Sequence, residues 1–280
     1  MFTGIVLSLR EGLEAALTIG IVLGVVQKMD RSDLKPVIWR GAVSAMILSL
    51  IAAIALNVVG AALEGKAEAI YEGITMLMAA SILTWMIFWM RRQSRKLKQN
   101  IESEVRQKTA QNGQMGIFLL AFLGVLREGI ELSIYLLAAS LSSTTLQVVI
   151  GAALGLSAAA LLGWMLFATS KRISLPKFFK ATNVVMVVFA GGLIGLSLQA
   201  FNTAGWIPVI IPHVWNINSF LSDQSTLGEI LKSLFGYRSN PSLSEVMGYF
   251  GYYVVLLVVI YFTRERRERK LARVDLPNKR

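Results

Sequence analysis

The stretch that decides the fold is residues 9–14, Leu-Arg-Glu-Gly-Leu-Glu, which lies inside the apolar run 2–26. A near copy, Leu-Arg-Glu-Gly-Ile-Glu, occupies residues 126–131 inside the apolar run 115–141. Neither run can cross about 30 Å of hydrocarbon without its charged motif, so both motifs are expected near the middle of a membrane helix. Ionisable groups at that depth cost several kcal/mol and usually mark the path of an ion or substrate. The doubled motif therefore predicts a transporter and not an enzyme.

The composition of the whole chain predicts an all-α polytopic membrane protein. Of its 280 residues, 55% are hydrophobic, and the mean hydropathy is +0.59. Several apolar runs exceed the ~20 residues that span a bilayer as a helix. There is no cysteine, which excludes disulfides and thiolate metal sites. We expect seven transmembrane helices, at residues 2–26, 37–63, 70–90, 115–141, 146–169, 181–201 and 246–263.

The net charge of +11 comes from lysine and arginine in the connecting segments, which argues for membrane topology and against nucleic-acid binding. Positive residues crowd the first, third and fifth connections and the C-terminal tail. Because cytoplasmic loops are enriched in lysine and arginine, the N-terminus is predicted outside and the C-terminus in the cytoplasm. This orientation requires an odd number of spans, in agreement with seven.

The order of the segments predicts one permease domain, 1–280, built on an internal repeat. The two motif copies begin units of three predicted spans, 1–90 and 115–201. Since three is odd, the second unit enters the membrane from the opposite side, which predicts two inverted three-helix repeats with a site near the midplane. The other segments are predicted as a cytoplasmic linker helix (91–114), an extracytoplasmic loop with one or two short helices (202–244), an extra seventh helix (245–263) and a basic cytoplasmic tail (264–280).

Four glutamates in the two motifs are the candidate metal ligands. Residues three apart share a helix face, so Glu11 and Glu14 project together, and so do Glu128 and Glu131. Carboxylate oxygens are hard ligands that suit magnesium, calcium, manganese or iron. The only histidine, His213, lies in the predicted external loop and is expected to be a surface residue.

Arg10 and Arg127 are candidate supporting residues, because each can reach the glutamate four positions later. With all groups ionised, two guanidiniums leave two of the four carboxylates uncompensated. Such a buried site is stable only if it takes up protons or a cation. The alternative is a pair of buried salt bridges with a purely structural role. Gly12 and Gly129 are also candidate supporting residues, since they allow another backbone to approach closely.

A second group of acids, Glu64, Glu68 and Glu72, leads into the third predicted span on the predicted outer side. Glu68 and Glu72 share a helical face, and Glu72 lies about one turn into the apolar run. We interpret Glu68 and Glu72 as an outer mouth that attracts cations and contributes metal ligands. A solvated helix start is the alternative.

Other functions also fit carboxylates at membrane depth. One is a permease for another hard divalent cation such as manganese, and a second is a structural or sensory membrane subunit. A third is a membrane enzyme with a di-iron centre. Di-iron sites usually need Glu-x-x-His pairs, and no predicted span contains a histidine.

Further motifs accompany the two Arg-Glu-Gly-x-Glu copies: Glu68-x-x-x-Glu72-Gly73 and the segment 83–90, LTWMIFWM. Over nearly the whole chain, the sequence resembles the oxidase-dependent iron permease family. The closest likeness is to its bacterial EfeU-type branch, with the fungal high-affinity iron permeases as wider kin. The resemblance implies import of iron, Fe2+ or Fe3+, across the bacterial cytoplasmic (inner) membrane, with iron as substrate and no permanently bound cofactor. The family's motif glutamates and its third-span acid match Glu11, Glu14, Glu128, Glu131 and Glu72.

The resemblance also implies partners. Such permeases work beside an extracytoplasmic oxidase or peroxidase and an iron-binding lipoprotein, which must here be separate polypeptides. Membrane lipid is the remaining expected partner; nucleic acid is not expected, and a homo-oligomer is left open.

Overall fold

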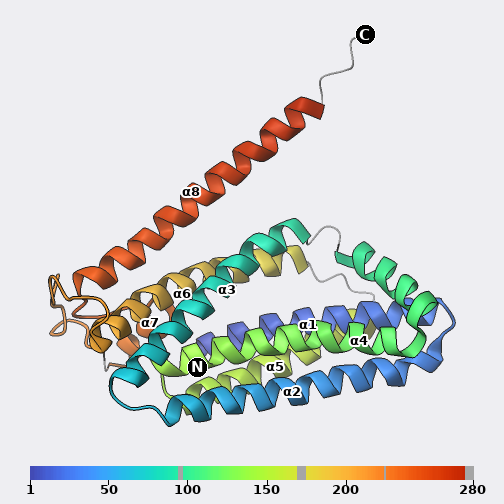
Figure 1. The fold of residues 1–280 in the computed structure, drawn as a ribbon, viewed down its shortest axis with the longest axis horizontal. Helices are drawn as coiled ribbons and strands as arrows, with labels where there is room; N and C mark the ends of the chain where they lie inside the picture. The colour runs from blue at the N-terminus through green and yellow to red at the C-terminus, as the bar shows by residue number, and fades with distance from the viewer. Residues whose placement is uncertain (94–96, 169–174, 224, 275–280) are drawn as a thin grey trace.

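The computed structural model describes residues 1–93, 97–168, 175–223 and 225–274, and in these ranges all regular structure is helical (Figure 1). The all-α prediction is therefore confirmed. The elements are α1 (Phe2–Lys28), the 3-10 turn η1 (Ser32–Leu34), α2 (Lys35–Ala61), α3 (Lys66–Gln93), α4 (Leu97–Ser142), α5 (Thr145–Ala168), α6 (Leu175–Ala204), α7 (Thr226–Phe235) and α8 (Leu243–Val274).

The long helices agree with a multi-pass membrane protein. In the part of the chain that is described, five helices are long and apolar enough to cross a membrane: α2, α3, α5, α6 and α8. The motif helices α1 and α4 are not among them, and each carries an arginine and two glutamates inside its apolar stretch. Each predicted span coincides with most of one long helix. Seven membrane crossings remain a prediction.

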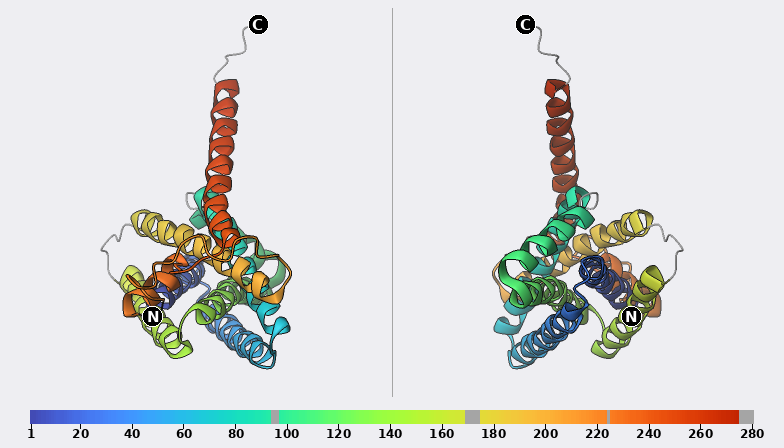
Figure 2. Two further views of the ribbon diagram at one scale, coloured as in Figure 1. Left: turned by 90° about the vertical axis from the view of Figure 1, so that its left-hand side faces the viewer. Right: turned by 90° about the vertical axis from the view of Figure 1, so that its right-hand side faces the viewer.

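Helices α1 and α4 run antiparallel through the centre of the bundle (Figure 1). Helix α1 packs most extensively on α5 and α4, α4 packs most extensively on α2, and α3 pairs with α6. In Figures 1 and 2, α2 and α5 lie on one side of the central pair, and α3 and α6 lie on the other. The two motif copies are thus carried by the central pair of helices.

The first part of α4 turns back along the bundle. The chain bends at Gly113, whose φ of 53° and ψ of −129° are readily adopted only by glycine. Before the bend, Val105 is fully buried in the apolar cluster that contains Ile117, and Ile101 packs against the same cluster. The segment 91–114 was expected to be a solvated helix. Its described part instead buries one face, because Ile101 and Val105, four residues apart, lie on the same side of the helix.

Helix α7 is the one short helix in the described part of the predicted external loop. Its N-cap residue Ser225 accepts a hydrogen bond from the backbone N–H of Gly228 at 3.0 Å. Farther along α7, the buried hydroxyls of Ser233 and Thr3 lie 2.9 Å apart. Helix α7 is thereby joined to the first turn of α1.

Helix α8 begins with a reciprocal capping box. The backbone N–H of Ser242 donates to Glu245 Oε1 at 3.3 Å, and the backbone N–H of Glu245 donates to Ser242 Oγ at 3.4 Å. The Ser-x-x-Glu spacing is typical of a helix start. From there α8 leans away from the bundle (Figure 1) and contacts mainly α6. The predicted linker residues 94–96, fifth-connection residues 169–174 and tail residues 275–280 lie outside the described residues.

Candidate functional site

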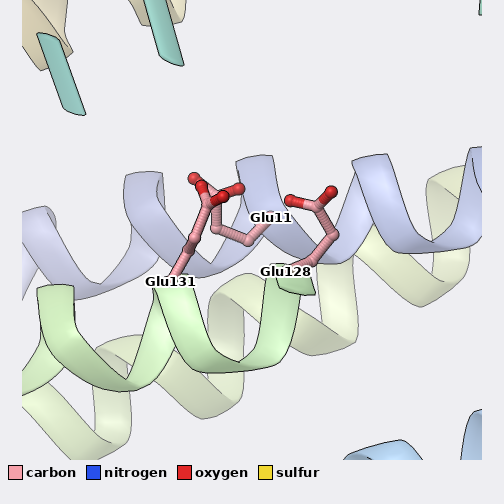
Figure 3. A group of neighbouring side chains, drawn as sticks. All are labelled: Glu11, Glu128 and Glu131. Carbon is pink, nitrogen blue, oxygen red and sulfur yellow. The ribbon is translucent and has the colours of Figure 1, made fainter. Parts of the chain in front are cut away.

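The centre of the bundle holds a cluster of carboxylates from both motifs. Ligand oxygens of Glu11, Glu128 and Glu131 all lie within 4.8 Å of one another (Figure 3). Glu11 is 1% exposed and Glu128 is 8% exposed, so the cluster is shielded from solvent. Like charges at this separation repel strongly in a medium of low dielectric constant. The spacing suits three ligands around one cation.

Glu14 lies about one turn farther along α1, and it is not part of the three-carboxylate cluster. Its carboxylate is buried, with Oε1 at 3.2 Å from Arg10 Nη2. The structure thus brings three of the four motif glutamates together and places the fourth beside them, against an arginine.

Arg10 is fully buried and links both glutamates of its own motif. Its Nη1 donates a hydrogen bond to Glu11 Oε1 at 2.6 Å, and its Nη2 forms the contact with Glu14. Sequence spacing predicts only the contact with Glu14. The additional contact gives Glu11 a cationic partner that the spacing does not predict, and one guanidinium is thereby shared between two carboxylates.

Glu131 is held from two directions on α4. Arg127 Nε donates to Glu131 Oε1 at 2.9 Å, and the phenol of Tyr135 donates to Oε2 at 3.3 Å. No ion pair with an arginine is found for Glu128 among the described residues. The second motif therefore keeps one carboxylate without a cationic partner, as the charge count predicts.

Within the described residues, the buried oxygens Glu11 Oε2 and Glu128 Oε2 have no hydrogen-bond partner, and Glu14 Oε1 has the ion-pair contact with Arg10 but no hydrogen bond. Buried polar atoms are nearly always hydrogen-bonded, because leaving one unpaired costs free energy. Buried carboxylate oxygens without a hydrogen-bond partner are the donor set that a hard cation requires.

The motif glycines let neighbouring helices pack closely beside the cluster. A Cβ built on Gly12 would lie 2.7 Å from Ala159 Cβ of α5. A Cβ built on Gly129 would collide with the side chain of Ser49 on α2. Each motif is therefore packed against one flanking helix at the position of its glycine.

The other acids considered lie outside the cluster. Glu64 and Glu68 are exposed near the start of α3, Glu72 is half-buried one turn beyond Glu68, and His213 is exposed in the loop before α7. A separate cavity of about 200 Å³ includes Arg238, Glu245 and several aromatic side chains in its wall, and none of the motif glutamates lines it.

Sequence reasoning missed three residues that contact the motif side chains. Tyr135 could have been found, because it follows Glu131 by four positions on the same helix face. Met86 and Trp89 of α3 contact Arg10 and Arg127, respectively. These two contacts join distant parts of the chain, and helical spacing around the motifs gives no signal for them.

Comparisons with known proteins agree with these features. The model of the Iron permease FTR1 family matches residues 1–268. The ferrous iron permease EfeU of Escherichia coli O157:H7 is 34% identical over 260 residues, covering 92% of this chain and 94% of that protein. The same figures hold for the protein of that name from Shigella sonnei (strain Ss046).

The ferrous iron permease EfeU of Yersinia pestis is 33% identical over 263 residues, which are 93% of each chain. No solved structure shows a significant match. The family match and these relatives extend over nearly the whole sequence and include both motif helices. This protein belongs to the iron permease FTR1 family.

Proposed function

We propose that this protein imports ferrous iron across the cytoplasmic membrane through the carboxylate cluster of its two motifs. The observation that carries the proposal is the approach of Glu11, Glu128 and Glu131 to within 4.8 Å of one another from two antiparallel helices. The family, and relatives named as ferrous iron permeases, support iron as the substrate.

The electrostatics of the cluster favour a cation as its occupant. The unpaired oxygens of Glu11 and Glu128 gain a partner when an ion replaces part of its hydration shell with carboxylates. Arg10 and Arg127 hold neighbouring carboxylates in place and reduce their mutual repulsion. When the ion leaves, these arginines keep the vacated site from carrying the full charge of four glutamates. Glu14, beside the cluster, serves as the next ligand along the path.

The packing of the helices supports the inverted repeat. Exchanging α1 with α4, α2 with α5 and α3 with α6 converts the α1–α5 contact into the α4–α2 contact. The same exchange maps the α1–α4 and α3–α6 contacts onto themselves. Two related units that meet at a central site can alternate access by rocking against each other.

The route follows from the predicted orientation. With the N-terminus outside, Glu68 and Glu72 form the outer mouth, and iron then passes to the motif glutamates. Moving two positive charges inward gains about 4–5 kcal/mol per 100 mV of membrane potential, at about 2.3 per charge. The loop 202–244 faces outward, where an oxidase or peroxidase and an iron-binding lipoprotein dock.

Uptake of radiolabelled iron into proteoliposomes tests the proposal. Glu128→Gln keeps the shape of the side chain and removes its charge, so we expect it to abolish uptake while the protein still inserts and stays folded. Glu104→Gln, an exposed position before the bend in α4, is the matched control and should transport like the unmodified protein. Iron uptake by Glu128→Gln equal to that of the unmodified protein would contradict the proposal.

A permease for manganese is the second candidate, because the all-carboxylate donor set of the cluster suits Mn2+ as well as Fe2+. Competition distinguishes the two. If iron is the substrate, an equal concentration of Mn2+ lowers radiolabelled iron uptake by less than half. The di-iron enzyme is disfavoured, since the clustered residues that could hold a metal in the described structure are all glutamates.

A further inference from the structure

Helix α3 carries neither motif, yet two of its side chains touch the two motif arginines. Met86 Sδ accepts a hydrogen bond from Arg10 Nη1 at 3.1 Å. The ring of Trp89 lies under the guanidinium of Arg127, with Arg127 Cζ at 4.2 Å from the ring centre. Since Met86 and Trp89 are three residues apart, they lie on the same face of α3. One turn of α3 therefore contacts the arginine of each motif, Arg10 and Arg127.

The environment of Met86 is more polar than that of an ordinary core methionine. Its neighbours Leu83 and Ile87 belong to an apolar cluster between α3, α4 and α6. Met86 is fully buried, but its sulfur lies 3.1 Å from Arg10 and 4.0 Å from the hydroxyl of Tyr135. A thioether sulfur is a weak acceptor, and here it accepts from Arg10 beside the hydroxyl that donates to Glu131.

Three groups in the described structure hold the guanidinium of Arg10. Nη2 forms the 3.2 Å ion pair with Glu14, and Nη1 donates hydrogen bonds to Glu11 and Met86, while Nε has no hydrogen-bond partner. Both bonds start from the same nitrogen, Nη1. A change at Met86 therefore bears directly on the arginine that links Glu11 and Glu14.

Arg127 depends on its neighbour in a different way. Its side chain is 36% exposed and donates through Nε to Glu131 Oε1 at 2.9 Å. A partly exposed arginine is free to change rotamer, and an aromatic ring beneath it restricts that freedom. Trp89 supplies this ring, and it thereby holds the donor of Glu131 in place.

We propose that α3 positions the two motif arginines, with Met86 acting on Arg10 and Trp89 on Arg127, and so sets the geometry of the carboxylate cluster. This inference rests on the proposed function of that cluster. Met86 and Trp89 are positioning residues, since neither is among the clustered carboxylates.

Two substitutions of Met86 separate positioning from packing. Met86→Leu keeps the volume and apolar character but removes the acceptor, whereas Met86→Gln keeps the length and supplies an amide oxygen in place of the sulfur. For a packing role, Leu is tolerated and Gln is harmful. For a positioning role the order is reversed: Leu raises the half-saturating iron concentration by about 10-fold to 100-fold, and Gln restores it to within a few-fold of the unmodified protein.

The measurement is uptake of radiolabelled ferrous iron into proteoliposomes at several iron concentrations, normalised to the protein inserted. Met78→Leu, on a 41% exposed position of α3, is the control and should leave uptake unchanged. A normal half-saturating concentration in Met86→Leu overturns the role of Met86. Equal impairment of the Leu and Gln variants also overturns it.

Substitutions of Trp89 test the positioning role of α3 independently, which matters if a Met86 variant fails to insert into the membrane. Trp89→Phe retains an aromatic face under Arg127, and Trp89→Leu does not. We expect the Leu variant to raise the half-saturating concentration about tenfold and the Phe variant to recover most of the loss. Trp85→Leu, at a 70% exposed position one turn earlier, is the matched control. Equal behaviour of the Phe and Leu variants overturns the role of Trp89.

Glu128→Gln, assayed in parallel, keeps the two hypotheses apart. One outcome rejects the role of α3 but still supports the carboxylate site: Glu128→Gln loses uptake, while Met86→Leu and Trp89→Leu show normal uptake kinetics. Normal uptake in Glu128→Gln rejects the carboxylate site itself.

Discussion

The phenol of Tyr135 donates a 3.3 Å hydrogen bond to Glu131, one turn earlier on α4. Together with the bond from Arg127 to the other oxygen of the same carboxylate, it holds Glu131 before any cation arrives. The side chain of Glu131 is therefore the most firmly oriented of the three that form the cluster.

Removing this hydroxyl should weaken iron binding. We predict that Tyr135→Phe raises the half-saturating iron concentration about tenfold, the effect typical of losing a group that orients a metal ligand. Uptake kinetics in proteoliposomes check this, with Tyr261→Phe, 66% exposed on α8, as the control. Unchanged kinetics in Tyr135→Phe would show that Arg127 alone orients Glu131.

The two arginines should respond differently to lysine. Arg10 is buried and uses two nitrogens to reach two glutamates, whereas Arg127 is partly exposed and bonds Glu131 through Nε alone. A lysine has one terminal nitrogen and cannot reproduce the fork of a guanidinium. We predict that Arg10→Lys lowers uptake at least tenfold more than Arg127→Lys. Arg31→Lys, in an exposed ion pair, is the control, and a larger loss in Arg127→Lys contradicts the prediction.

A methyl group on Gly129 should push α2 away from α4. Because a Cβ at this position collides with the side chain of Ser49, we predict that Gly129→Ala destabilises the protein by about 1–3 kcal/mol, a typical cost of overpacking. It should also reduce uptake, since Glu128 and Glu131 flank the displaced residue. Thermal unfolding in detergent and iron uptake measure the two effects.

Removing the side chain of Ser49 on α2 tests whether the collision with Ser49 causes the effect of Gly129→Ala. The double variant Gly129→Ala/Ser49→Gly removes the colliding atoms and should regain most of the lost stability and uptake. Ser49→Gly alone is the control for the second change. If the double variant is as impaired as Gly129→Ala, the contact with Ser49 is not the cause.

The bend at Gly113 should depend on glycine. A β-carbon at φ 53° and ψ −129° is strained by roughly 1–3 kcal/mol, so we predict that Gly113→Ala lowers the thermal midpoint and exposes the segment around Val105 to protease. On α1, Gly24 has open space around it, so Gly24→Ala is the control and should be neutral or slightly stabilising. Equal midpoints for the two variants would contradict the role of the bend.

Much of this architecture follows from local sequence patterns. Apolar runs predict the helices, and three- and four-residue spacing predicts the contacts of Arg10 with Glu14 and of Arg127 with Glu131. Local spacing does not predict which carboxylates meet across helices. Glu14 lies outside the cluster because the register of α1 against α4 depends on how the whole length of the two helices packs. The sequence around the glutamates does not encode that register.

Contacts between distant segments were likewise beyond sequence reasoning. Met86 lies 76 residues from Arg10, and a methionine in an apolar run looks like any core residue. The bend at Gly113 was missed for a related reason. A single glycine in a polar helical segment is compatible with a straight helix, and the turn becomes evident only when Val105 is seen packed against Ile117.

The antiparallel course of α1 and α4 has a further electrostatic consequence. The backbone dipoles of the two helices point in opposite directions where they pass the cluster, and each acts mainly within the terminal turns. Glu11 and Glu128 are more than two turns from either end of their helices. The electrostatic potential at an ion bound in the cluster is therefore governed by side chains. Charge substitutions around the cluster can change that potential without changing the backbone of the helices.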